Sequence, residues 1–182
     1  MKNFRIKKED TLLLMIDIQE RLAPAMNKSD KVIDNNKILI TALKEMKIPI
    51  LYTEQYPKGL GRTLPELTEI IGKAKPLEKI VFSAFNKELK DELIESGRVN
   101  IILTGMEAHV CVYQTARDLI DNGFNVFLVS DGVASRTSDN HYVGLQLIKD
   151  LGGVITSTEV VLFDLLHAAG SDEFKLVSKL VK

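Results

Sequence analysis

Cys111 is the only cysteine in the chain, and its surroundings make it a candidate nucleophile. It follows the apolar segment 99–104 and opens a helical pattern, so it stands where a strand turns into a helix. A helix N-terminus lowers the pKa of a thiol through unpaired N–H groups and the macrodipole. The commoner fate of a lone cysteine is to pack as a small buried hydrophobic residue. This segment alone leaves both interpretations open.

Asp17 and Lys79 are charged residues that border other apolar segments. Asp17 ends an almost wholly apolar run, where a carboxylate either caps a turn or acts as a catalytic group near a partly dry cleft. Lys79 immediately precedes an apolar triplet, so its ammonium could be held near Asp17 and Cys111, although most lysines are solvated surface charges. Gln19 would point to the same side as Asp17 and could hydrogen-bond a substrate or a loop backbone.

The sequence predicts neither a metal site nor a phosphate loop. His109, His141 and His167 are scattered, and the one cysteine has no second cysteine as a co-ligand. His109 could polarise the Cys111 thiol, line the pocket or face solvent. The segment Pro-Lys-Gly-Leu-Gly-Arg (57–62) matches neither GxGxxG nor the P-loop pattern, so we expect a flexible loop over the cleft. We therefore predict no metal and no cofactor.

Short apolar runs alternate with longer amphipathic stretches along the whole chain. We expect strands at residues 11–17, 48–53, 79–82, 99–104, 125–130 and 154–157. We expect helices at residues 30–46, 63–72, 86–96, 109–122, 138–151 and 171–181. Runs that are apolar on both faces are typical of parallel strands covered by helices. The sequence therefore predicts an α/β fold in one domain, residues 1–182, with three α/β/α layers and a Rossmann-like, doubly wound, six-stranded parallel sheet.

Such a sheet has a predictable place for a ligand. Ligands bind beyond the carboxyl ends of the strands, where the strand order reverses. If the first strand lies beside the fourth, Asp17 and the turn between Gly105 and Cys111 face one cleft. The sequence alone does not establish that the first and fourth strands are adjacent.

The composition excludes some classes of partner. The chain of 182 residues has 24 basic and 25 acidic residues and a net charge of −1, which gives no electrostatic reason to expect nucleic acid or an anionic membrane. The first ten residues lack an apolar signal core, and no run approaches the roughly 18 apolar residues of a membrane span. With a single cysteine, a reducing cytoplasm is the expected location.

Three motifs stand in the order found in the isochorismatase-like cysteine hydrolase family, which includes nicotinamidases and N-carbamoylsarcosine amidase. They are Leu-Leu-Met-Ile-Asp17-Ile-Gln-Glu, Glu-Lys79-Ile-Val-Phe-Ser-Ala-Phe and Leu-Thr-Gly105-Met-Glu-Ala-His-Val-Cys111-Val-Tyr-Gln-Thr. Each motif alone is weak, but the ordered set is specific, and the resemblance covers nearly the whole chain. The stretches Thr53-Glu-Gln-Tyr-Pro-Lys-Gly-Leu-Gly and Asp131-Gly-Val-Ala-Ser-Arg136 most resemble the isochorismatase-domain-containing subgroup.

The resemblance implies a catalytic triad of Asp17, Lys79 and Cys111. It also implies a cis peptide between Met106 and Glu107, whose role would be to aim the backbone N–H of Glu107, with that of Cys111, at one point as an oxyanion hole.

Two departures from the family pattern narrow the implied activity. Nicotinamidases commonly carry an Asp-x-His metal motif after the second strand, whereas this chain has Glu54-Gln55-Tyr56, which puts a metal and nicotinamidase activity in doubt. True isochorismatases lack the nucleophilic cysteine, so its presence argues against hydrolysis of a vinyl ether. Because the family commonly self-associates, the resemblance also implies a homo-oligomer.

The sequence and the resemblance together predict a cysteine-dependent hydrolase that cleaves an amide-type C–N bond of a small molecule through a thioester. The predicted substrate-binding residues are Gln19, Gln55, Tyr56, Phe82, Phe85 and His109. Two rivals stay open: a flavodoxin-like or nucleotide-binding protein, which the missing phosphate loop disfavours, and a catalytically silent small-molecule-binding or scaffold protein that retains the hydrolase fold.

Overall fold

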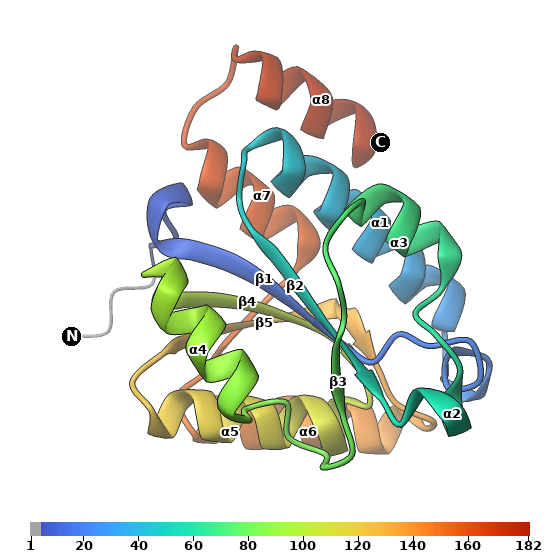
Figure 1. Ribbon diagram of the computed structural model, residues 1–182. Helices are drawn as coiled ribbons and strands as arrows, with labels where there is room; N and C mark the ends of the chain where they lie inside the picture. Colours follow the sequence, from blue (N-terminus) through green and yellow to red (C-terminus); the bar gives the residue numbers. More distant parts are fainter. Residues whose placement is uncertain (1–4) are drawn as a thin grey trace.

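A computed structural model describes residues 5–182. Residues 1–4, which belong to the expected domain and to the N-terminal segment expected to lack a signal core, lie outside the described residues. Six strands form one all-parallel sheet in the order β3-β2-β1-β4-β5-β6 (Figure 1). The strands are β1 (Thr11–Ile16), β2 (Ile50–Gln55), β3 (Leu77–Lys79), β4 (Asn100–Met106), β5 (Asn125–Ala134) and β6 (Val154–Thr156). The predicted α/β fold with a six-stranded parallel sheet is confirmed.

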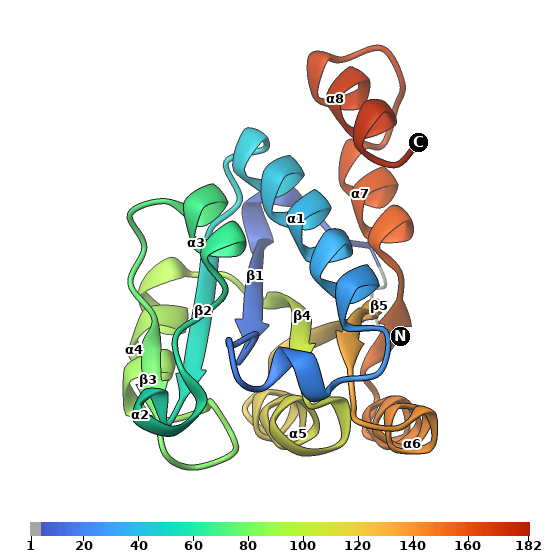
Figure 2. The ribbon, with the colours of Figure 1, turned by 90° about the vertical axis from the view of Figure 1, so that its right-hand side faces the viewer.

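Helices cover both faces of the sheet, which gives the three predicted layers (Figures 1 and 2). One layer contains α1 (Ser29–Glu45), α3 (Pro65–Ile71), α7 (Thr158–Leu166) and α8 (Asp172–Leu180). The other contains α4 (Lys87–Ser96), α5 (Tyr113–Asp121) and α6 (Ser138–Asp150). Shorter helical segments are η1 (Lys8–Asp10), η2 (Ala23–Ala25), α2 (Pro57–Leu60) and η3 (Ala108–Val112).

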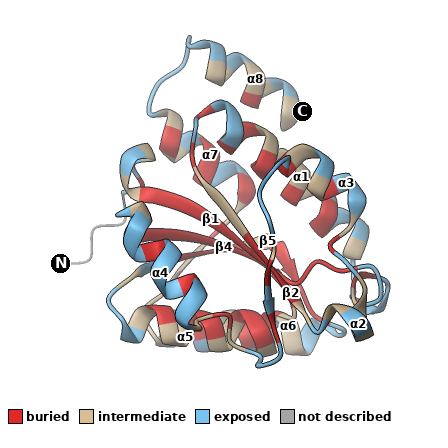
Figure 3. Cartoon of the chain, viewed as in Figure 1, coloured by how far each residue is buried: buried red, intermediate tan, exposed pale blue. Residues whose placement is uncertain are grey.

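Strand β1 is buried along its whole length (Figure 3). Because side chains alternate along a strand, Leu13 and Met15 enter one hydrophobic cluster, while Leu12, Leu14 and Ile16 enter the other. A run that is apolar at every position is therefore explained by two covered faces. Each fully buried side chain of this kind contributes about 1.5–3 kcal/mol relative to an exposed one.

The third strand is placed differently from the prediction. The sequence predicts a strand at residues 79–82, but β3 ends at Lys79. After Lys79 the chain turns, and the carbonyl oxygens of Val81 and Phe82 face the Lys79 ammonium at 3.5 and 3.0 Å. The Lys79 side chain therefore binds these backbone carbonyls, and the apolar side chains of Val81 and Phe82 are exposed.

Among the described residues, two α-helical segments, α2 and α7, were not predicted. Residues 158–166 form α7, whose Val161, Leu162 and Leu165 are buried against the sheet. The run Val-Val-Leu-Phe is so uniformly apolar that it shows no helical period. The clearest sequence signal is Ser157, a residue type favoured as an N-cap, whose side chain accepts a hydrogen bond from the Val160 N–H. The expected flexible loop at residues 57–62 includes the helical turn α2 and is tied to the chain after β1 by several hydrogen bonds.

The assumed adjacency of the first and fourth strands is correct. Strand β1 pairs with β4, and Ile16 lies opposite Gly105 at the carboxyl edge of the sheet. Gly105 has φ +123°, and a Cβ atom there would lie 2.0 Å from the Ile16 carbonyl oxygen, so only glycine fits. Asp17 follows directly, also with a positive φ of 50°. The strand order reverses between β1 and β4, which makes this edge the switch point.

Candidate active site

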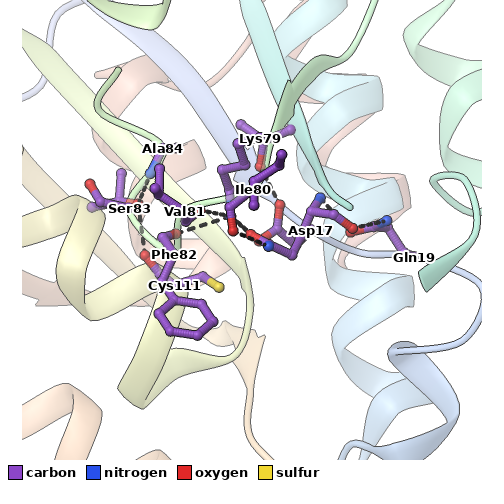
Figure 4. A network of polar contacts seen from close by, with 12 residues as sticks. Asp17, Gln19, Lys79, Ile80, Val81, Phe82, Ser83, Ala84 and Cys111 are labelled. Atoms are coloured by element: carbon purple, nitrogen blue, oxygen red, sulfur yellow. Dashed lines mark hydrogen bonds and ion pairs between the residues drawn. The ribbon is translucent and has the colours of Figure 1, made fainter. Parts of the chain in front are cut away.

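Asp17 and Lys79 form a buried ion pair at the carboxyl edge of the sheet (Figure 4). Lys79 Nζ donates a hydrogen bond of 2.6 Å to Asp17 Oδ2. The Thr53 hydroxyl, from neighbouring strand β2, donates one of 2.6 Å to Asp17 Oδ1. Both carboxylate oxygens are therefore bound by fixed donors. The carboxylate is held in one orientation between three strands.

The Lys79 ammonium has an acceptor for each of its three N–H groups. Besides Asp17, Gln55 Oε1 accepts at 2.9 Å and the Phe82 carbonyl oxygen at 3.0 Å. An ammonium has three donors and no acceptor, so these contacts saturate it. Figure 4 shows the segment Ile80–Phe82 curling around Lys79. Its carbonyls point inward, and its side chains are left 54–80% exposed.

Cys111 lies in the π-helical turn η3, directly before α5. Single π-turns of this kind are frequent at functional sites. The thiol is buried, and the Asp17 carboxylate, the Lys79 ammonium and the backbone of Glu107 lie close enough to shift its pKa. Cys111 is thus next to the ion pair. The three residues of the expected triad meet in one place.

The pKa of the Cys111 thiol is raised, contrary to the lowering expected at a helix N-terminus. Burial is the largest cause, and the negative charge of Asp17 adds to it; together they raise the pKa to about 12 despite the opposing charge of Lys79. The pKa of Asp17 is raised as well, because burial of the carboxylate outweighs the attraction of Lys79. At neutral pH the sulfur therefore carries a proton, next to a carboxylate that is more basic than an ordinary aspartate.

The peptide between Met106 and Glu107 is cis, as the resemblance implied. The Glu107 side chain binds Arg136: its carboxylate accepts a hydrogen bond of 3.0 Å from Arg136 Nε. The role of the Glu107 and Cys111 N–H groups as an oxyanion hole stays a prediction.

Gln19 and Gln55, two of the predicted substrate contacts, bind other parts of the protein. Gln19 is fully buried, and its amide makes hydrogen bonds to the backbone of Gln55 and to the Gly61 carbonyl. Gln55 reaches Lys79 through Oε1 and the Ile80 carbonyl through Nε2. Gln55 thus contacts Lys79 directly, and Gln19 is linked to Lys79 through Gln55.

The remaining predicted substrate contacts differ in their burial and in their partners. Tyr56 and Phe82 are about half exposed, at 52% and 54%. Phe85 packs edge-on against Phe124, with ring centroids 6.2 Å apart, within the hydrophobic cluster under α4 and α5. The His109 ring is turned to the Ser135 hydroxyl, with Nδ1 3.0 Å from Oγ. The role of these four residues as substrate contacts stays a prediction.

Thr53 was missed by the sequence reasoning, although it binds the carboxylate directly. The available signal was its place near the end of the apolar run 48–53, at the same sheet edge as Asp17. A threonine in a strand is common because β-branched side chains suit strands, so the signal is weak. The carbonyls that hold Lys79 have no sequence signal at all.

Within residues 5–182, no three His, Cys, Asp or Glu side chains gather in a way that could hold a metal ion. The predicted absence of a metal and a cofactor stays a prediction. None of the described helices is both long and apolar enough to cross a membrane.

The sequence matches the Isochorismatase domain over residues 11–160, so the chain belongs to the isochorismatase family. It is 35% identical over 178 residues to isochorismatase domain-containing protein 2 of Danio rerio, covering 97% of this chain and 89% of the relative. It is 36% identical over 183 residues to the secreted isochorismatase effector Isc1 of Phytophthora sojae, covering 98% and 87%. The resemblance drawn from the three motifs is confirmed.

Solved structures of this fold are also similar. The MAR1 ribonuclease of Caenorhabditis elegans superposes with a TM-score of 0.92 at 35% identity, covering 97% of this chain and 92% of that one. The YcaC gene product of Escherichia coli, described as an octameric hydrolase of unknown specificity, superposes with a TM-score of 0.91 at 22% identity, covering 99% and 90%. At that lower identity the likeness establishes the fold alone.

Proposed function

We propose that the chain is a cysteine-dependent hydrolase that cleaves an amide-type C–N bond of a small molecule through a thioester. The observation that carries this proposal is the position of Asp17, which accepts a hydrogen bond from the Lys79 ammonium and lies close enough to the buried Cys111 thiol to raise its pKa. A thiol, a base next to it and a group that orients the base are the parts that nucleophilic catalysis requires.

In the first half of the reaction the thiol attacks while it loses its proton. Asp17 takes the proton as the Cys111 sulfur bonds to the carbonyl carbon, and the carbonyl oxygen becomes an oxyanion. The backbone N–H groups of Glu107 and Cys111 would bind that oxyanion. When it collapses, the C–N bond breaks, and the amine leaves with the proton from Asp17. The product on the enzyme is a thioester.

The second half is the hydrolysis of the thioester. Asp17, again a carboxylate, takes a proton from water as the water oxygen attacks the acyl carbon. The C–S bond then breaks, the acid is released, and the sulfur regains its proton from Asp17. Lys79 keeps its positive charge throughout, which stabilises the carboxylate between the two proton transfers. No external oxidant, reductant or metal is needed for this cycle to balance.

Two rival functions are tested by the same experiment. The first is a silent small-molecule-binding or scaffold protein that retains the fold. The second is RNA cleavage, which the name of the C. elegans neighbour suggests for that protein. A net charge of −1 gives this chain no general attraction for RNA.

The test is a panel of small amides and a set of oligoribonucleotides, assayed with the wild type, Cys111→Ala and Cys111→Ser. We expect an amide to be hydrolysed by the wild type only, and intact-protein mass spectrometry of the quenched reaction to find an acyl adduct on Cys111. Amide turnover that persists in Cys111→Ala would refute the nucleophile. RNA cleavage without amide turnover would favour the second rival, and no turnover with tight binding would favour the first.

Three further proposals concern domain organisation, location and self-association. We propose that residues 1–182 form one domain, that the chain acts in the cytoplasm, and that it self-associates. The octameric state described for the E. coli relative supports self-association, and the exposed side chains of Ile80, Val81 and Phe82 supply an apolar surface that a second copy would cover. The P. sojae relative is named as secreted, so the location needs a direct test by cell fractionation.

A further inference from the structure

We propose that Gln19 and Gln55 form a relay of two side-chain amides that positions the Lys79 ammonium, and through it the carboxylate of Asp17. They would act as positioning residues, in place of the substrate contacts predicted from the sequence. The geometric part of this proposal stands alone, whereas its consequence for catalysis rests on the proposed hydrolase function.

The first step of the relay is the contact of Gln19 with the backbone of Gln55. Gln19 Nε2 donates to the Gln55 carbonyl oxygen at 3.0 Å, and Gln19 Oε1 accepts from the Gln55 N–H at 2.8 Å. One side-chain amide thus pairs with both polar groups of a single residue, as a neighbouring strand would. The second Nε2 hydrogen is donated to the Gly61 carbonyl at 2.7 Å. No N–H of this buried amide is left for a substrate.

The second step is the contact of the Gln55 side chain with Lys79. Gln55 Oε1 accepts from Lys79 Nζ at 2.9 Å, and Gln55 Nε2 donates to the Ile80 carbonyl oxygen at 2.5 Å. These partners fix the orientation of the amide, because a flipped amide would place its NH₂ group against an ammonium. The backbone of Gln55 is held by Gln19 and its side chain by the Lys79 segment, so residue 55 joins the two.

The relay matters because a lysine side chain is long and flexible. Its ammonium is a compact charge on a four-carbon stem, so its place must be set by acceptors around it. Two of those acceptors are Asp17 and the Phe82 carbonyl, and Gln55 Oε1 is the third. Removal of the third acceptor would leave one buried N–H with only the distant Val81 carbonyl, at 3.5 Å, and let the ammonium move. The charge that stabilises Asp17 would then shift.

A purely structural role for Gln19 is the alternative. Its bond to Gly61 helps to tie the segment that contains α2 to the chain after β1. That segment has further ties, however: the N–H of Glu20 donates to the Arg62 carbonyl, and the N–H of Arg21 donates to the Leu60 carbonyl, both at 3.0 Å. Loss of the Gly61 contact alone would therefore leave the segment attached. A change in the behaviour of the Lys79 ammonium on substitution of Gln19 distinguishes the relay from a purely structural role.

The test measures the solvent exchange of the Lys79 ammonium protons by ¹⁵N NMR, with Lys79→Met to assign the signal. We expect exchange about tenfold faster in Gln55→Met, as for the loss of one hydrogen bond of a charged group. Gln19→Met should change it in the same direction, and the double variant should match Gln55→Met, because the two residues act in series. Gln55→Glu keeps the acceptor and should keep the exchange slow. Gln146→Met, on α6, is the matched control.

Unchanged exchange in both methionine variants, or effects that add in the double variant, would overturn the relay. If Gln55→Met does not fold, Gln19→Met and Gln55→Glu still carry the comparison. Alkylation of Cys111 by iodoacetamide is measured in parallel, and it should slow in Gln19→Met, since a displaced Lys79 favours the thiolate less. If the exchange rates change as expected while the wild type hydrolyses no amide, the relay stands and the hydrolase function fails.

Discussion

Asp17 Oδ2 accepts a hydrogen bond of 2.6 Å from Lys79 Nζ, and neither side chain is more than 1% exposed. Two opposite charges so deeply buried have given up their hydration, which their mutual attraction and further hydrogen bonds must offset. Thr53 supplies such a bond to the carboxylate, and Gln55 supplies one to the ammonium. Removal of one charge alone leaves the other buried without its partner.

Lys79→Met and Asp17→Asn should each destabilise the protein by about 3–5 kcal/mol, whereas the double variant should recover most of that loss. The reason is the unpaired charge that each single variant leaves behind. Chemical denaturation with a two-state fit measures the three values. Lys87→Met, which removes an exposed ion pair with Asp91, is the control and should leave the stability unchanged. A double variant as unstable as the sum of the singles would contradict this account.

Asp17→Asn should lower turnover by about 100–10,000-fold, the contribution expected from a general base. The same variant should speed the alkylation of Cys111 by iodoacetamide at neutral pH, because the negative charge of Asp17 raises the pKa of the thiol. Lys79→Met should slow alkylation, since Lys79 lowers that pKa. A fall of both turnover and alkylation in Asp17→Asn would show that Asp17 does not suppress the thiolate.

The pH dependence of turnover follows from the raised pKa of Asp17. The base must be ionised to accept the thiol proton, so turnover should be lost as the pH falls through that pKa. Because the pKa lies above the ordinary value for aspartate, the acid limb should lie at a higher pH than an unperturbed aspartate would give. A profile of kcat/KM against pH measures the limb. A limb at or below the ordinary aspartate value would refute the assignment.

Gly105→Ala should destabilise the fold by more than about 4 kcal/mol, a loss seen only for a defined structural defect. The added Cβ would lie 2.0 Å from the Ile16 carbonyl oxygen, where backbone cannot move aside without separating β1 from β4. Gly97→Ala is the matched control: it also has a positive φ, but no atom lies within 4 Å of its Cβ. It should cost about 1–2 kcal/mol. Thermal unfolding of both variants measures the difference.

A double variant, Ile80→Lys with Val81→Lys, should reduce self-association, because two charges would be placed in the proposed apolar contact between copies. Light scattering should find the wild type well above the 20.4 kDa of one chain and the variant closer to it. Ile94→Lys, at an exposed apolar position on α4, is the control and should assemble like the wild type. A wild-type mass near 20.4 kDa would refute self-association itself.

The sheet could be predicted from the sequence because its central strands are buried on both faces. A run such as residues 11–16 has no solvated side, and that pattern has few alternatives. Elements at the edge of the sheet are harder to predict from the sequence. β3 is a three-residue edge strand, and the more apolar residues beside it, Ile80 to Phe82, were mistaken for it. α7 was missed because its apolar residues fill more than one helical face.

The site was predictable as far as its side chains lie at strand ends. Asp17, Lys79 and Cys111 met as expected, since parallel strands bring their carboxyl ends to one edge. The direction of the Cys111 pKa could not be predicted, because it depends on burial and on how near Asp17 lies. The contacts of Gln19 were equally hidden, since they are made to the backbone of a residue 36 positions away.

The ammonium of Lys79 is held by the carbonyls of the segment that follows it, and carbonyls are common to every type of residue. Positions 80, 81 and 82 can therefore diverge without removing an acceptor from the ammonium. Duplicated descendants of this chain could keep the same reaction centre and acquire different outer surfaces, and with them different assembly partners. The reaction centre and the assembly surface would then evolve separately, although the backbone of residues 80–82 serves the first and their side chains serve the second.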